Sequence, residues 1–277
     1  MPKMSDSKWS IYLSIFVLLC IIVSGLAAPL IMPYNPFQPD MSIRLQSPNS
    51  EHWLGTDALG RDMLSRMILG SRNTIIISLL CTLIALMVGG IIGMLAGYYG
   101  KTADKLYNIF CNIFQGIPGS CLMIAIAGFW GPGIGGLVLA VVISNWTGFS
   151  RIIRAEVIRI RQAGYIEGLI CLGAGDMRII FHHILPNLRG IMLVLGTQRL
   201  GRSILSIAGL SFLGLGIQPP APDWSVMIND SMLYYRSAPY LVLIPGCGIF
   251  LLVSSINNIG KHLERCFGWH KNEVRPE

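Results

Sequence analysis

The residues that could do chemistry in this chain are few, because only 13% of its 277 residues are charged, against roughly 25% in ordinary soluble domains. The first group consists of Gln198, Arg199 and Arg202, which lie inside an apolar run. A charge inside an apolar helix is costly and usually faces a bundle interior or a water-filled cavity. These three residues are therefore candidates for a path along which a polar solute crosses a membrane.

Arg199 and Arg202 are three residues apart, which places them on one face of a helix. Two guanidinium groups facing a cavity would repel a bare divalent cation and attract the carboxylate of a peptide or an anionic metal chelate. The alternative is that both side chains lie near a helix end and extend to lipid headgroups. The stretch from Asn187 to Arg202 corresponds to roughly 22 Å of helix, which favours the cavity.

The second group is the segment LGTDALGRD at residues 54–62. Gly55 and Gly60 supply turn geometry, and Asp57, Arg61 and Asp62 could pair into a capped, charge-linked turn. We favour a structural plug that starts an interfacial helix through residues 63–71. The alternative is direct contact between this turn and a partner protein.

The third group is a polar island between two apolar runs, YIEGLICLGAGDMRIIFHHILPN at residues 165–187. The pattern predicts a helix over 163–172, a turn at 173–175 and a second helix from Asp176, with Asp176 as N-cap and Pro186 as the stop. Such a hairpin is a rigid knob that could sit in a groove of another protein. Its apolar side chains need a surface to cover them: Ile166, Leu169, Ile170, Ile179 and Phe181.

No pattern in the sequence predicts an enzyme. Gly100-Lys101-Thr102 resembles the end of a phosphate-binding loop, but position 95 is Leu where that loop needs Gly. Ser211 has no histidine in any span to act as its base. The seven cysteines form no CxxC pair and are interpreted as packing residues. We therefore expect no catalytic residue, no metal site and no ATP site in this chain.

The elements that must position these groups are apolar runs long enough to cross a bilayer, which needs about 20 residues per helix. No alternation with a period of two supports a barrel, so we expect an all-α integral membrane protein with six transmembrane helices. The windows are Ser10–Ile31, Thr74–Tyr98, Leu106–Trp130, Gly133–Phe149, Gly190–Ile217 and Tyr240–Ile259. The fifth of these windows is long enough to tilt or break.

Lysines and arginines predict the orientation of the spans. Of the 21 Lys and Arg residues, Arg199 and Arg202 lie inside a span, and the others divide 14 to 5 between the two sides. The positive-inside rule then places both termini and residues 150–189 in the cytoplasm. This bias accounts for the net charge of +7, so nucleic-acid binding is not expected.

Three motifs occur in a characteristic order: WLGTDALGRDMLSRMI, YIEGLICLGAGDMRIIFHHILPN and GLSFLGLGIQPPAPDW. With the six-span layout, they resemble the permease subunits of bacterial ATP-binding-cassette (ABC) importers of the dipeptide, oligopeptide and nickel group, specifically the second of the two permeases. The resemblance implies the type I permease fold in the bacterial inner membrane. It also implies a heterodimer with a second permease, two cytoplasmic ATPases that bind ATP and Mg, and an extracytoplasmic solute-binding protein.

The resemblance also assigns the polar island as the loop that contacts the ATPase. The family loop has the form E-A-A-x3-G-x9-I-x-L-P, and Gly168, Leu169 and His183 replace its two alanines and its isoleucine. These replacements alter the expected fit to the ATPase, whereas the spacing of the loop is kept. The residues assigned to coupling are Glu167, Gly168, Gly173, Ala174, Gly175, Asp176, His183, Leu185 and Pro186.

The resemblance divides the chain into a first span with an extracytoplasmic loop (1–72), a core permease domain (73–268, with the coupling loop at 151–189) and a cytoplasmic tail (269–277). We expect peptide import, with nickel or metal-chelate import as the alternative, because Trp146 and the run 224–230 are similar to nickel-type members. A stand-alone secondary transporter is less expected, since it would need ionisable groups in several spans.

Overall fold

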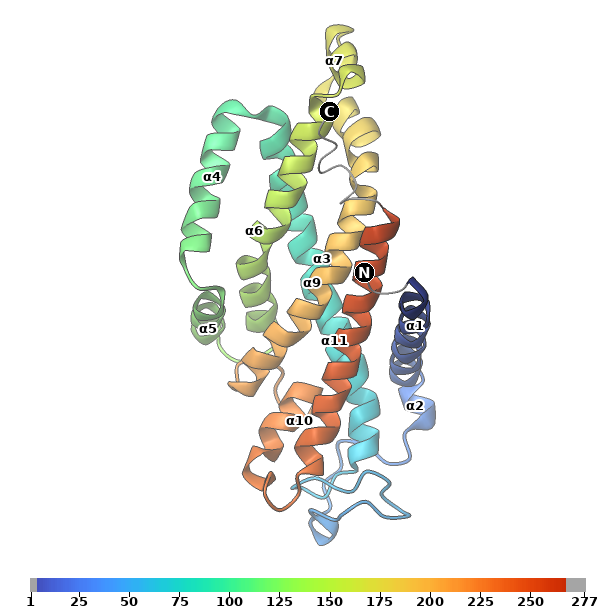
Figure 1. Cartoon of the computed structure of the whole chain (residues 1–277). Coiled ribbons are helices and arrows are strands. Elements are labelled where there is room, and N and C mark those ends of the chain that lie inside the picture. Colours follow the sequence, from blue (N-terminus) through green and yellow to red (C-terminus); the bar gives the residue numbers. More distant parts are fainter. Residues whose placement is uncertain (1–3, 268–277) are drawn as a thin grey trace.

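The computed structural model describes residues 4–267, and its described part is a bundle of helices (Figure 1). Five helices are long and apolar enough to cross a membrane, in the described part of the chain. They are α1 (Met4–Leu26), α3 (Met63–Tyr99), α6 (Ile134–Arg161), α9 (Leu185–Phe212, which continues the helix begun at Asp176) and α11 (Tyr240–Cys266). A bent pair, α4 (Lys101–Gly116) and α5 (Gly119–Trp130), makes up a sixth span if it is counted as one.

The short elements gather at the two ends of this bundle (Figure 1). At the hairpin end lie α7 (Gly164–Cys171), α8 (Asp176–Ile179) and the π-helix η2 (Ile180–Ile184). At the opposite loop end lie residues 32–62 with η1 (Met41–Ile43), together with α10 (Trp224–Ser231) and η3 (Met232–Tyr234). The helix α2 (Ala28–Ile31) links α1 to the loop end.

The expected span over 106–130 is a bent pair of helices. The chain bends by 87° between α4 and α5. The cause is local: Pro118 has no backbone N–H, and it forces the preceding Ile117 into an extended conformation with φ −96° and ψ 130°. As a result α5 turns across the end of α4 (Figure 1). The helix α4 is joined to α6 by a hydrogen bond between the hydroxyls of Tyr107 and Ser150 at 3.0 Å and by the ion pair of Asp104 with Arg154.

Other helices begin and end differently from the expected windows. The helix α3 begins at Met63, so the expected interfacial helix forms its first turns, and the domain boundary placed at residue 72 falls inside it. Likewise α6 continues past Phe149 to Arg161, so the first part of the 150–189 insert belongs to this helix. The helix α9 ends at Phe212, before the expected Ile217. The expected cytoplasmic tail, 269–277, lies outside the described residues.

The closest helix pair is α3 with α6, and glycines make the approach possible. A Cβ atom added at Gly89 or Gly93 would overlap the backbone carbonyl of Trp146 or Ser150, and one added at Gly97 would lie 2.8 Å from the carbonyl oxygen of Arg154. Small residues at intervals of four let two membrane helices pack backbone to backbone. We call Gly89, Gly93 and Gly97 with the facing carbonyls the glycine seam.

At the loop end, Asp223 and Trp224 fix α10 to the bundle. Asp223 is fully buried, caps α10 by accepting from the backbone N–H of Ser225, and accepts from Thr74 Oγ1 at 2.6 Å. Trp224 Nε1 donates to the carbonyl of Met67 at 2.9 Å, and its ring fills the space left by Gly70. These contacts join α10 to α3.

The glycine seam predicts different costs for two neighbouring alanine substitutions. We expect Gly93→Ala to lower the free energy of unfolding by about 1–3 kcal/mol, because the methyl group overlaps the Ser150 carbonyl. Gly90→Ala is the matched control, since its Cβ would meet only Ile153 Cδ1 at 3.5 Å. The measurement is denaturant unfolding of the purified chain in detergent, and equal effects of the two substitutions would contradict the seam.

Candidate functional site

The hairpin of α7 and α8 is anchored by buried isoleucines. Ile166 of α7 and Ile179 of α8 are fully buried, as is Ile184 of η2, and Ile180 is 2% exposed. They belong to one apolar cluster with Val157 and other residues of α3 and α6. The surface that Ile166 and Ile179 were expected to need is therefore supplied by this chain itself.

Polar contacts add to this anchor. Tyr98, at the end of α3, donates its hydroxyl to Asp176 Oδ1 at 2.8 Å. The guanidinium of Arg161, at the end of α6, lies 5.4 Å from the centre of the Tyr98 ring, within cation–π range. Asp176 is the first residue of α8 and not its N-cap, which is Gly175 without a side-chain bond. The carboxylate of Asp176 binds Tyr98 instead of capping.

The tip of the hairpin is open to contact by another molecule. Gly173 has φ +79°, which favours glycine, and a Cβ at Gly168, Gly173 or Gly175 would meet nothing within 4 Å. Glu167 and Asp176 are exposed. The hairpin also carries exposed apolar side chains, which are the pattern of a contact surface: Ile170 (43% exposed), Phe181 (52%), Met177 (63%) and Leu172 (85%). Sequence reasoning missed Leu172 and Met177.

Pro186 does not end the second helix of the hairpin. It lies in the first turn of α9, and the helix continues through it after the π-helix η2. A proline ring clashes with the carbonyl four residues earlier in a regular α-helix, and the wider π turn provides room for it. The side-chain amide of Asn187 donates to the backbone carbonyl of His183 at 2.6 Å, which gives that carbonyl a hydrogen-bond partner. Ala174, His183, Leu185 and Pro186 are half-buried.

At the loop end, two glycines shape the turn at residues 54–62. Gly55 and Gly60 both have φ +75°, and a Cβ at Gly60 would overlap the carbonyl of Asp40. Any larger residue would be strained at both positions. The turn closes with a backbone bridge between Thr56 and Asp62.

The charged residues of this turn are buried and paired. Arg61 Nε lies 2.7 Å from Asp57 Oδ2, and Asp57 Oδ1 accepts from the backbone N–H of Leu59 and Arg61. Asp62 caps α3 by accepting from the backbone N–H of Ser65, and Asp62 Oδ1 lies 2.9 Å from His52 Nδ1. The expected charge-linked, capped turn is therefore present.

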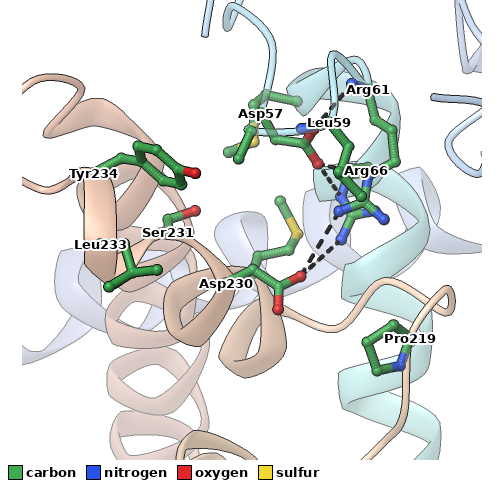
Figure 2. A pocket seen from close by; sticks show the side chains of 12 residues that line it. Asp57, Leu59, Arg61, Arg66, Pro219, Asp230, Ser231, Leu233 and Tyr234 are labelled. Atoms are coloured by element: carbon green, nitrogen blue, oxygen red, sulfur yellow. Dashed lines mark hydrogen bonds and ion pairs between the residues drawn. The ribbon is translucent and has the colours of Figure 1, made fainter. Parts of the chain in front are cut away.

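Two further charged residues complete this cluster, and sequence reasoning missed both. Arg66 is 2% exposed; its Nε lies 3.4 Å from Asp57 Oδ2 and its Nη2 lies 3.8 Å from Asp230 Oδ2. Figure 2 shows the guanidinium groups of Arg61 and Arg66 between the two carboxylates, beside a pocket of about 270 Å³. Burial raises the pKa of Asp230, while the arginines act in the opposite direction. The spacing of Asp62 and Arg66, one helical turn apart, suggests an ion pair between them, but Arg66 lies near Asp57 and Asp230 instead.

Of the three candidate path residues, Gln198 and Arg199 bind different helices. Gln198 donates to Glu264 of α11 at 2.8 Å. Arg199 Nη2 donates to the Gly148 carbonyl of α6 at 3.0 Å, and its guanidinium lies 5.1 Å from the Phe149 ring centre. Arg202 is exposed on α9. A Cβ at Gly148 would overlap the guanidinium of Arg199, so a larger residue there would displace this side chain.

Comparison with known proteins identifies the family. A family model described as "binding-protein-dependent transport system inner membrane component" matches residues 89–267. The chain is 39% identical to the glutathione transport system permease protein GsiD of Pectobacterium atrosepticum, over 90% of this chain and 83% of that protein. It is 38% identical to the dipeptide transport system permease protein DppC of Alkalihalophilus pseudofirmus, over 90% and 82%. Identity to the nickel transport system permease protein NikC of Escherichia coli is 34%, over 93% of each.

A solved structure shares the fold. A chain of the MetNI methionine ABC transporter, in an inward-facing conformation, aligns with a TM-score of 0.60 at 18% identity and covers 74% of this chain and 97% of that chain. At this identity the likeness concerns the fold alone. The family match over residues 89–267, the curated relatives and this shared fold agree. The chain belongs to the inner membrane permease subunits of bacterial binding-protein-dependent ABC importers.

Proposed function

We propose that this permease takes up peptides and that its hairpin of α7 and α8 receives the movement of partner ATPases. The observation that carries the proposal is the hairpin's division into two faces. Ile166 and Ile179 are fully buried against the bundle, whereas Leu172 and Met177 are exposed. A knob that is rigidly held by one protein and apolar on its outside is suited to pass a displacement from a partner into the spans.

The charge distribution supports an orientation for this arrangement. The hairpin end carries most of the basic residues, so the positive-inside rule places it, with both termini, in the cytoplasm. The loop end then faces the extracytoplasmic side, where a solute-binding protein delivers its cargo. We propose two cytoplasmic ATPases, with their own ATP and Mg, and a second permease as the remaining partners.

The coupling set consists of the exposed tip and its anchors. Glu167, Gly168, Gly173 and Gly175 lie where an ATPase surface could reach them. Asp176 connects the tip to α3 through Tyr98. Ala174, His183, Leu185 and Pro186 are half-buried and hold the hairpin in place from below.

The substrate is proposed to carry a carboxylate. Relatives named for glutathione and dipeptide transport support a peptide, and a relative named for nickel transport supports a metal or its chelate as the alternative. Arg202 is exposed on α9 and Arg199 lies beside it. These cations favour an anionic solute over a bare divalent cation, so peptide import is the better-supported candidate.

The exposed tip predicts a loss of ATPase binding when its apolar character is removed. We expect Leu172→Asp to weaken co-purification of the ATPase by about tenfold or more, the loss typical of a central apolar interface residue. Leu233→Asp is the matched control, because Leu233 is 89% exposed at the loop end and Leu172 is 85% exposed at the hairpin end. Retention of the ATPase by L172D, or its loss from both variants, would refute the assignment.

The path predicts a transport defect without an assembly defect. We expect Arg202→Ala to lower whole-cell dipeptide uptake by about tenfold or more, since a charged hydrogen bond contributes about 1.5–3 kcal/mol. The complex should assemble normally, because Arg202 is exposed. Arg202→Lys keeps the charge and should retain part of the uptake. Unchanged uptake by R202A excludes Arg202 from the path, and a defect in Ni²⁺ uptake alone would favour the nickel alternative.

A further inference from the structure

An open apolar groove runs along the side of the bundle, away from the hairpin tip and the loop-end pocket. It has a volume of about 530 Å³ and lies between α1, α3, α9 and α11. Leu83 of α3 and Leu193 of α9 form opposite sides and are 47% and 52% exposed. Gly196 contributes to the floor, where an added Cβ would lie 3.7 Å from Leu86 Cδ2. The absence of a side chain at Gly196 thus helps to keep the groove open.

The groove has the length and position of one bilayer leaflet. Its lining on α9 extends from Leu185 to Leu200, and the part from Arg189 to Leu200 is about 16 Å long at 1.5 Å per residue. One leaflet contributes about half of a hydrocarbon core that is about 30 Å thick. The Leu185 end lies at the hairpin end, and the Leu200 end lies near the middle of α9. An acyl chain from the leaflet at the hairpin end would therefore fit along it.

The interior of the groove offers almost nothing to a polar ligand. Its two threonine hydroxyls are already engaged: Thr197 donates to the carbonyl of Leu193 at 2.8 Å, and Thr82 donates to that of Ser78 at 2.7 Å. Among the described residues that line the groove, Arg189 is the only one with a charge. It is exposed and lies one helical turn from Leu185 toward the middle of α9.

We propose that this groove binds a phospholipid with an anionic headgroup. The acyl chain lies along α9 between α1 and α3, and the headgroup phosphate pairs with the guanidinium of Arg189. Arginine suits this role, because its planar fork binds phosphate through two parallel hydrogen bonds. The bound lipid fills the space between α1 and α9, two helices that would otherwise be separated by a void in that half of the membrane. This site goes beyond the proposed transport function and does not depend on it.

The test uses the assembled importer in lipid nanodiscs. The probes are a phosphatidylglycerol and a phosphatidylcholine that carry the same photoactivatable acyl chain, and mass spectrometry locates the labelled peptides. We expect phosphatidylglycerol to label residues 79–86 and 185–200 about fivefold more than phosphatidylcholine, the ratio expected from one arginine near an anionic lipid. Arg189→Gln should remove this preference, whereas Arg151→Gln, at an exposed arginine of α6, should leave it unchanged.

A second pair of variants tests the acyl-chain part of the site. Leu83→Trp should fill the groove and reduce labelling by both probes. Leu80→Trp is the matched control, because Leu80 is 44% exposed on the same helix but does not line the groove. Equal labelling of the wild-type importer by both probes overturns the proposal. So does the absence of label at these peptides in the complex when the isolated chain is labelled, since the second permease would then be the occupant.

Discussion

The close contact between α3 and α6 is the constraint on which the rest of the structure depends. In a hydrocarbon environment lipid is as apolar as leucine, so helices associate through close packing and not through the hydrophobic effect. Gly89, Gly93 and Gly97 allow the two backbones to touch. Because α3 runs from the loop end to the hairpin end, where α6 also finishes, this contact links the base of the hairpin to a helix that begins at the loop end.

Each end of α3 is then fixed by a few polar residues. At the loop end, Arg66 on the first turns of α3 lies near both Asp57 of the turn and Asp230 of α10. A buried charge is costly unless it is paired, so this cluster fixes which segments meet. At the hairpin end, Tyr98 on the last turn of α3 binds Asp176 of α8. The same helix therefore contacts both the loop end and the hairpin that we propose as the ATPase contact.

The sequence alone predicted the features of the fold that depend on the local residue pattern. Apolar runs of about 20 residues identified the long helices, and the turn residues at 173–175 located the hairpin. The glycines at 89, 93 and 97 form a small-residue repeat that predicts a close helix contact, although the sequence interpretation did not include it. Pro118 was also a readable signal for the break between α4 and α5. The path of the chain at Pro186 was mispredicted because a π turn removes the clash that normally ends a helix there.

Tertiary contacts account for what local pattern did not predict. Asp230 joins the cluster at Asp57 from a distant part of the chain, and no spacing indicates that pairing. The local sequence predicts that the carboxylate of Asp176 caps a helix, yet the hydroxyl of Tyr98 binds this carboxylate instead. In the sequence, Ile166, Ile179 and Phe181 look alike, because all three are apolar residues in a polar segment. Packing against α6 buries the two isoleucines and leaves Phe181 exposed.

The central claim is that the hairpin contacts the ATPase while its buried face holds it to α3 and α6. The most direct test places a photoactivatable phenylalanine analogue at Met177, which is 63% exposed on the hairpin, and irradiates cells that contain the whole importer. The same analogue at Leu233, at the loop end, serves as the comparison. The account predicts a covalent adduct with the ATPase from position 177 and none from 233. An ATPase adduct from 233, or its absence at 177 in an assembled and active importer, would contradict it.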